Sequence, residues 1–330
     1  MAPAKSTKVI ATFPPGYFLE NIALLRDDSL LITVPNRQEL YCLPPAPTPS
    51  AARVPILLHK FEEDQWTMAM CNAPNDLNLI YLVTTDFTGT GRRHAHLHVL
   101  NSSNVADGSH PVQLMQFPPN AKGLNGMCQL SSNVILAADS FEGVIWRIDI
   151  TFNKNVAEKA EAREWLRDDA FTGVLKLPDF QPGVNGLKYS PSSGYVCFSN
   201  SQQKTFGKIK VNPHTFDPVG ESEILATGMQ GDDLIIDEGY LGGPVAYLTA
   251  HRDNTVLRIP IAKEGLEATE KEVEVVTKVT ADEAVMLGPT AGVWQRGLEG
   301  KVAYFTCDGG LKHPMEDGVV RWARVVRVEF

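Results

Sequence analysis

Long apolar runs are missing from this chain of 330 residues, and no segment reaches the roughly 18 apolar residues needed to cross a bilayer. Residues 1–13 also lack a long apolar stretch, so we expect neither a signal peptide nor a membrane partner. Blocks of positive charge are missing as well, and the formal net charge is −9. Nucleic-acid binding needs a basic face, so we expect no nucleic-acid partner.

Cysteine is scarce: the chain has five, an odd number, and no two are closely spaced. A disulfide framework or a zinc cluster requires paired or closely spaced cysteines, so this pattern favours neither. Each cysteine lies within or beside an apolar run, which is typical of reduced, packed thiols. We therefore expect a cytoplasmic protein.

Apolar residues make up 43% of the chain, and its 26 glycines and 22 prolines are spread along the whole length. Turn residues between short apolar runs are typical of an all-β protein. A repeat is visible, most clearly in residues 125–149 and 185–211. Each copy has a short strand that starts with Asn-Gly, then a more apolar strand, then an amphipathic strand. Asn-Gly alone is a turn signal, but its matching context in both copies favours an inner strand.

Six such units begin near residues 20, 66, 125, 185, 232 and 290, at steps of 46 to 60 residues. Repeats of about this length are typical of β-propeller blades. We predict a six-bladed β-propeller as one domain over residues 1–330, with blades that start near 17, 64, 122, 182, 229 and 287. The last unit runs out of chain after three strands, and residues 8–13 are predicted to pair there as a strand that closes the ring. The charged residues 153–169 are predicted to form a helical insertion in the third blade.

The order of the motifs "LENIA", "GLNG", "GVNGLK" and "DDLIID" resembles the senescence-marker-protein/gluconolactonase propellers, and most of all their fungal members. The resemblance extends over nearly the whole chain but is incomplete in the second blade. In that family a divalent cation sits at one end of the channel, held by a glutamate, an asparagine and an aspartate. The resemblance implies Glu20, Asn185 and Asp232 as its ligands here, with Asn125 as a further polar pocket residue. Oxygen ligands of this kind suit calcium or magnesium.

The chain also departs from the family pattern at two points. The usual "PDG" before the aspartate is replaced by Gly231-Asp232-Asp233, which leaves Asp232 or Asp233 as the pocket acid, and the register favours Asp232. Adjacent residues of a strand face opposite sides, so one of the two acids would face the channel while the other caps a turn. The arginine that often precedes the blade-three asparagine is replaced by Gly123 or Leu124, which argues against a sugar-acid lactone as substrate.

Further candidates for substrate contact lie on the same inner strands or on the loops beside them. Two histidines that follow second strands, His251 and His313, are candidate general acids or bases. A thiol nucleophile would need a paired histidine, and none is apparent for Cys307. The substrate-binding candidates are Trp66, Met68, Met127, Thr290, Trp294, His251 and Cys307.

Three functions remain open from the sequence. The fungal resemblance and the apolar pocket favour an enzyme of secondary metabolism that guides a hetero-Diels–Alder cyclisation of an enone or quinone methide with an alkene. Under that hypothesis the catalytic residues are Glu20, Asn125, Asn185 and Asp232. The alternative is a metal-dependent lactonase, and a third is a propeller that binds a ligand or protein without catalysis. The first two predict a small-molecule substrate, and a homodimer is one expected assembly.

Overall fold

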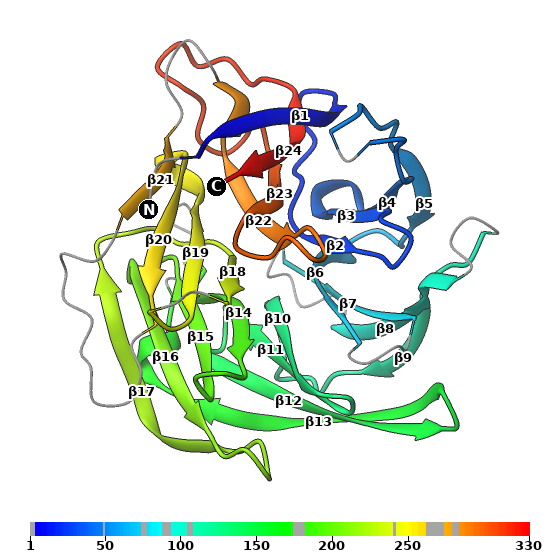
Figure 1. Cartoon of the computed structure of the whole chain (residues 1–330). Coiled ribbons are helices and arrows are strands. Elements are labelled where there is room, and N and C mark those ends of the chain that lie inside the picture. Colours follow the sequence, from blue (N-terminus) through cyan, green and yellow to red (C-terminus); the bar gives the residue numbers. More distant parts are fainter. Residues whose placement is uncertain are drawn as a thin grey trace.

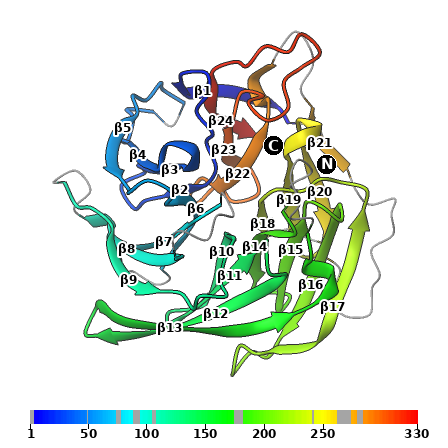
Figure 2. The same cartoon turned by 180° about the vertical axis from the view of Figure 1, so that it is seen from behind.

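Strands connected by short turns fill nearly all of the computed structural model, which describes residues 4–48, 50–73, 78–87, 94–103, 108–173, 182–239, 242–261, 274–278 and 284–330. They pair into six four-stranded antiparallel sheets. Figures 1 and 2 show these sheets arranged as blades around a central axis, with the first strand of each blade innermost. The predicted fold, an all-β six-bladed propeller, is confirmed.

Each of the first five blades is a continuous segment of chain. Their strands are β2 (Ile22–Leu24), β3 (Leu30–Val34), β4 (Glu39–Leu43) and β5 (Ile56–Lys60); β6 (Trp66–Asn72), β7 (Leu79–Thr85), β8 (His96–Asn101) and β9 (Val112–Gln116); β10 (Leu124–Ser131), β11 (Val134–Asp139), β12 (Val144–Asn153) and β13 (Val156–Arg167); β14 (Val184–Ser190), β15 (Tyr195–Asn200), β16 (Thr205–Val211) and β17 (Pro218–Thr227); β18 (Leu234–Asp237), β19 (Val245–Ala250), β20 (Thr255–Pro260) and β21 (Glu274–Lys278).

The sixth blade joins the two ends of the chain. It contains β22 (Pro289–Trp294), β23 (Val302–Cys307), β24 (Ala323–Glu329) and, at its outer edge, β1 (Ser6–Phe13). β1 pairs with β24 from Ser6↔Glu329 to Phe13↔Ala323, and the two strands lie side by side in Figure 1. The predicted closure is confirmed, because the N-terminal strand supplies the fourth strand that the last unit lacks.

Among the described residues we find no α-helix, and 3-10 turns occur at Pro35–Arg37, Asp169–Phe171, His251–Asp253 and Ala284–Met286, among other places. None of these helices is long and apolar enough to span a membrane. The helix predicted for residues 153–169 is wrong: most of that segment forms β13, which pairs with β12. Its Glu, Lys and Ala content favours a helix locally, but pairing with a neighbouring strand overrides that weak propensity.

The second strand of every blade is buried at each of its residues. Neighbouring blades cover both faces of these strands, which explains why they appear as nearly continuous apolar runs in the sequence. The apolar layers lie between adjacent blades, for example around Met127 and Trp146 between the second and third.

Buried hydroxyl groups join each blade to the next. One serine or threonine at or beside the end of each second strand donates a hydrogen bond of 2.5–3.1 Å to a backbone carbonyl at the start of the next blade. The last of these donors, Thr306, bonds the carbonyl of Glu20 and so returns to the first blade. We call these six residues the hydroxyl ring: Thr33, Thr85, Ser140, Ser199, Thr249 and Thr306.

The inner strands pack against one another so closely that the two Asn-Gly pairs need their glycines. A β carbon on Gly126 would lie 2.2 Å from the carbonyl oxygen of Asn185, and one on Gly186 would lie 2.7 Å from that of Asp232. Both pairs belong to inner strands, β10 and β14, as predicted. The glycines therefore serve close contact between blades.

We predict that Gly126→Ala lowers the free energy of unfolding by about 3 kcal/mol, because the new methyl group meets only backbone atoms of the next blade, which cannot move aside. Urea denaturation measures this change. The control is Gly239→Ala, whose new methyl group would lie 3.5 Å from its nearest neighbour, Asp237 Oδ1, and should shift stability by less than about 0.5 kcal/mol. Equal stability of the two variants would contradict this account of the packing.

Candidate functional site

A β-bulge near the start of each inner strand determines where the polar side chains lie. Register shifts occur at this point in β6, β10, β14 and β22. Backbone bonds place Glu20-Asn21 opposite Thr33, and Asp232-Asp233 opposite Thr249, in the same way. Bulges re-aim side chains that strict alternation would separate. The first residues of the six pairs are Glu20, Met68, Asn125, Asn185, Asp232 and Thr290.

Four of these residues are the polar ones predicted from the sequence, and all four are buried at one end of the channel. The turns that follow the second strands in blades five and six add His251 and Asp308 at the same end. We call this end the polar mouth, defined by Glu20, Asn125, Asn185, Asp232, His251 and Asp308.

Two asparagines of the polar mouth are fixed by similar bonds. The amide of Asn125 donates to Ser140 Oγ at 3.3 Å, and that of Asn185 donates to Ser201 Oγ at 2.9 Å. Asn185 also donates to Asp232 Oδ1 at 2.8 Å. With both N–H groups of Asn185 directed at protein atoms, its amide oxygen is the atom left to face a ligand.

Glu20 is the most poorly compensated group of the polar mouth. It is 5% exposed, and among the described residues none donates a hydrogen bond to its carboxylate. Burial raises the pKa of Glu20 well above its ordinary value, the charges of Asp232, Asp233 and Asp308 raise it further, and the positive charge of Lys312 opposes the rise. A buried carboxylate without partners is costly unless it is protonated or ligates a cation.

Asp232 shares this crowded environment. Burial raises its pKa to about 7, the positive charge of His251 opposes that rise, and the negative charge of Asp233 adds to it. Two buried acids that disfavour each other's charge are typical of sites that bind a cation or hold a proton for catalysis.

His251 and Asp308 form a hydrogen-bonded pair, with Nε2 of the histidine 3.0 Å from Oδ2 of the aspartate. Asp308 is fully buried and also accepts bonds from the backbone N–H groups of Gly310 and Lys312. Burial opposes the charged imidazole, but the bond to Asp308 together with the negative charges of Asp308 and Asp232 raises the pKa of His251 above its ordinary value. His251 was among the predicted residues, whereas Asp308 was missed.

A signal for Asp308 was present in the repeat. Like Ser201 and His251, it stands two residues after a hydroxyl-ring member, here Thr306. Side chains two apart on a strand share a face. The position therefore faces the polar mouth in blades four, five and six.

Oxygen atoms dominate the donor set of the polar mouth, which fits a hard cation such as Ca²⁺ or Mg²⁺ better than a soft one. The three predicted ligands, Glu20, Asp232 and Asn185, would offer two carboxylates and one amide oxygen to such a cation. Among the described residues, no group of three or more His, Cys, Asp or Glu side chains is positioned to hold a metal. The three predicted ligands would not count as such a group, because one of them, Asn185, is an asparagine.

Aromatic side chains lie around this end of the channel. The rings of Trp66 and Phe87 stack at 6.2 Å between centroids, and Phe87 lies 4.9 Å from Phe141. Phe18 lies 6.0 Å from the imidazole of His251. Phe141 fills the space beside Gly123, where a β carbon would lie 2.5 Å from the ring. No longer side chain at position 123 fits beside that ring.

Asp233 lies deeper in the channel and caps no turn. Its carboxylate accepts bonds from Lys188 Nζ at 2.9 and 3.0 Å and from the amide of Asn21 at 3.2 Å. The bulge explains why both acids reach the channel at different depths, where simple alternation predicts opposite faces. Asp232 is the acid at the polar mouth.

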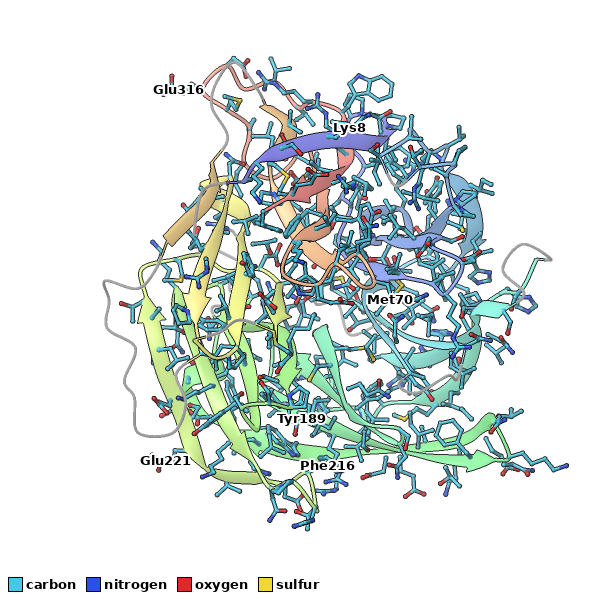
Figure 3. The ribbon with its side chains drawn as sticks, in the orientation of Figure 1. Lys8, Met70, Tyr189, Phe216, Glu221 and Glu316 are labelled. Atoms are coloured by element: carbon cyan, nitrogen blue, oxygen red, sulfur yellow. The ribbon has the colours of Figure 1, made fainter. Side chains whose placement is uncertain are left out.

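Two predicted substrate contacts, Met127 and Trp294, line a pocket further along the inner strands. Trp294 is four residues after Thr290, roughly 13 Å at the usual rise of a strand. The pocket has a volume of about 350 Å³, and Met70 and Tyr189, labelled in Figure 3, are among its lining residues. We call this end the pocket mouth, lined among others by Met70, Met127, Gln129, Lys188, Tyr189, Glu238 and Trp294.

Three other predicted contacts are buried in packing. Met68 is 3% exposed in an apolar layer, and its carbonyl accepts the bond from Thr33. Thr290 is fully buried and bonds the carbonyl of Leu19. Cys307 lies in the core layer around Phe305, where burial raises the pKa of its thiol. All five cysteines are free thiols.

Comparison with known proteins identifies the fold. No protein-family model matches the chain, and no curated protein matches it in sequence. Among solved structures it is similar to a luciferin-regenerating enzyme (TM-score 0.63, 11% identity, 98% of this chain and 95% of that one). It is also similar to regucalcin of Agrobacterium tumefaciens, described as a calcium-binding protein (0.59, 13%, 98% and 96%). A proposed gluconolactonase is similar too (0.55, 13%, 100% and 93%). At such identities the likeness establishes a shared six-bladed propeller fold.

Proposed function

We propose that the protein hydrolyses small cyclic esters at the polar mouth with the help of a divalent cation. The observation that carries this proposal is Glu20, a buried carboxylate without a hydrogen-bond donor beside a second acid, Asp232. A cation bound there would relieve the repulsion between the two acids. Two solved structures with a similar fold support the same chemistry: one is described as a calcium-binding protein and the other as a proposed gluconolactonase.

Glu20, Asp232 and the amide oxygen of Asn185 would hold the cation, calcium or magnesium. When bound, it would polarise the ester carbonyl and acidify water. The bond from Asn185 to Asp232 keeps that carboxylate in place before any ligand arrives. Asn125, held by Ser140, has its amide oxygen free to accept a hydrogen bond from a substrate hydroxyl.

His251 is the residue that moves the proton. Its Nε2 is engaged by Asp308, so Nδ1 is free to accept a proton from water while the water oxygen bonds to the carbonyl carbon. The ring C–O bond then breaks, and the departing alkoxide receives the proton from His251. The product is an open-chain hydroxy acid, and the histidine returns to its starting state.

The substrate class follows from the surroundings of the acids. Phe141 occupies the space beside Gly123, where relatives often carry an arginine, so no guanidinium is available there for a sugar acid. Trp66, Phe87 and Phe141 instead supply an apolar rim. We infer that the preferred lactones carry an aromatic or alkyl body.

The cyclase hypothesis has less support. Two of the apolar residues predicted to hold its substrate beside the polar cluster, Met127 and Trp294, line the pocket mouth instead. Neither a fungal origin nor a Diels–Alder reaction gains support from the similar structures. A propeller that only binds a ligand or protein would show no turnover with any lactone.

We expect Glu20→Gln to lower kcat/KM for dihydrocoumarin by at least about 100-fold and to abolish binding of one divalent ion per chain, because the variant lacks a charged oxygen ligand. Metal analysis and hydrolysis assays measure both effects. The matched control is Glu238→Gln at the exposed rim of the pocket mouth, which should keep both properties. Hydrolysis that persists in chelator and in Glu20→Gln would refute the cation-assisted mechanism.

We expect His251→Gln to lower kcat by roughly 10² to 10³-fold with little change in KM or in bound cation, since it removes the proton acceptor and no ligand. Asp308→Asn should have a smaller effect in the same direction, because it weakens the orientation of His251. His214→Gln, on an exposed turn, is the control. An unchanged kcat in His251→Gln would exclude this residue as the base and leave the cation site standing.

A further inference from the structure

The pocket mouth lies outside the proposed reaction, and its features point to a ligand of its own. Its volume of about 350 Å³ falls within the range of small-molecule sites. It collects side chains from most of the inner strands, so it is formed by the ring as a whole. None of its lining residues belongs to the polar mouth.

The charges of the pocket mouth select against anions. Lys188 is a cation on its lining, but both oxygens of Asp233 already bond its ammonium. Glu238 adds a negative charge at the exposed rim. The net charge of these three groups is therefore about −1, so an anionic ligand would be repelled.

One polar group in this pocket lacks a partner. The side chain of Gln129 lines it, and its buried amide nitrogen donates no hydrogen bond to any described residue. An unsatisfied buried donor costs about 1–3 kcal/mol. A ligand carrying a hydrogen-bond acceptor would recover much of that cost.

One apolar wall of the pocket, Trp294, is held in place. Trp294 donates its indole N–H to the carbonyl of Ile236 at 2.7 Å and packs edge-on against Tyr247, with centroids 5.1 Å apart. Its ring is thus fixed before a ligand arrives, which lowers the entropic cost of binding. Met70 and Met127 supply adaptable thioether surface on other strands.

From these four observations we propose that the pocket mouth is a second binding site, distinct from the polar mouth, for a neutral, flat and largely apolar small molecule with one hydrogen-bond acceptor. The ring packs between Trp294 and the methionines, and the acceptor receives the hydrogen bond of Gln129. This inference is independent of the proposed hydrolysis.

Prodan, a neutral naphthalene with a single ketone acceptor and an environment-sensitive emission, is a suitable probe. We expect saturable binding of one molecule per chain with a blue-shifted emission. Gln129→Met should weaken binding about 3- to 10-fold, since it keeps the side-chain volume but removes the donor. Asn72→Trp, at an exposed rim position, should block the opening and abolish binding.

Two comparisons assign the signal to this pocket. Glu20→Gln, at the polar mouth, should bind prodan as the parent does. 2-Naphthoate, an anion of similar shape, should bind more weakly than prodan. Glu238→Gln removes a negative charge from the rim and should therefore reduce the difference in affinity between the two compounds. Absence of saturable binding, or equal affinity in the parent, Gln129→Met and Asn72→Trp, would overturn the proposal. None of these binding measurements depends on turnover, so they test this proposal separately from lactone hydrolysis.

Discussion

The hydroxyl ring is the interaction on which the rest of this propeller depends. Six buried serine and threonine side chains each donate a bond from one blade to the backbone of the next, and the last returns to the first blade. Each bond contributes on the order of 1 kcal/mol. Their larger effect is on geometry, because each bond ties the end of one second strand to the start of the next inner strand, all the way around the ring.

These bonds position the residues of the polar mouth. Four of the six bulge pairs begin with a residue of the polar mouth: Glu20, Asn125, Asn185 and Asp232 meet there although they are far apart in sequence. The other two, Met68 and Thr290, are buried in packing. Burial and mutual repulsion raise the pKa values of Glu20 and Asp232. The fold tolerates this unfavourable arrangement because the closed ring holds the strands from all sides. Buried acids with pKa values raised in this way are typical of functional sites.

The channel has two ends with different chemistry. The polar mouth has oxygen donors, a histidine–aspartate pair and an aromatic rim. The pocket mouth has thioethers, a fixed indole and an unpaired amide donor. Between them Asp233 bonds Lys188 and Asn21 and forms a polar layer inside the channel. The same inner strands serve both ends: β6, β10, β14 and β22 have six to eight residues, which is long enough to carry different side chains to each end.

The sequence by itself determined the all-β class, the number of blades and the closing role of residues 8–13, because these follow from a periodic pattern that each segment carries locally. It also identified the four polar inner-strand residues. Only the tertiary structure decided which end of the channel each side chain reaches, since that depends on bulges and on the level of one blade relative to the next. Hence Met127 and Trp294 were grouped with Glu20 in the sequence but lie at the pocket mouth, and Asp308 was missed. Residues 153–169 form mainly a strand for the same reason: the partner strand that overrides their helical propensity is visible only in the folded blade.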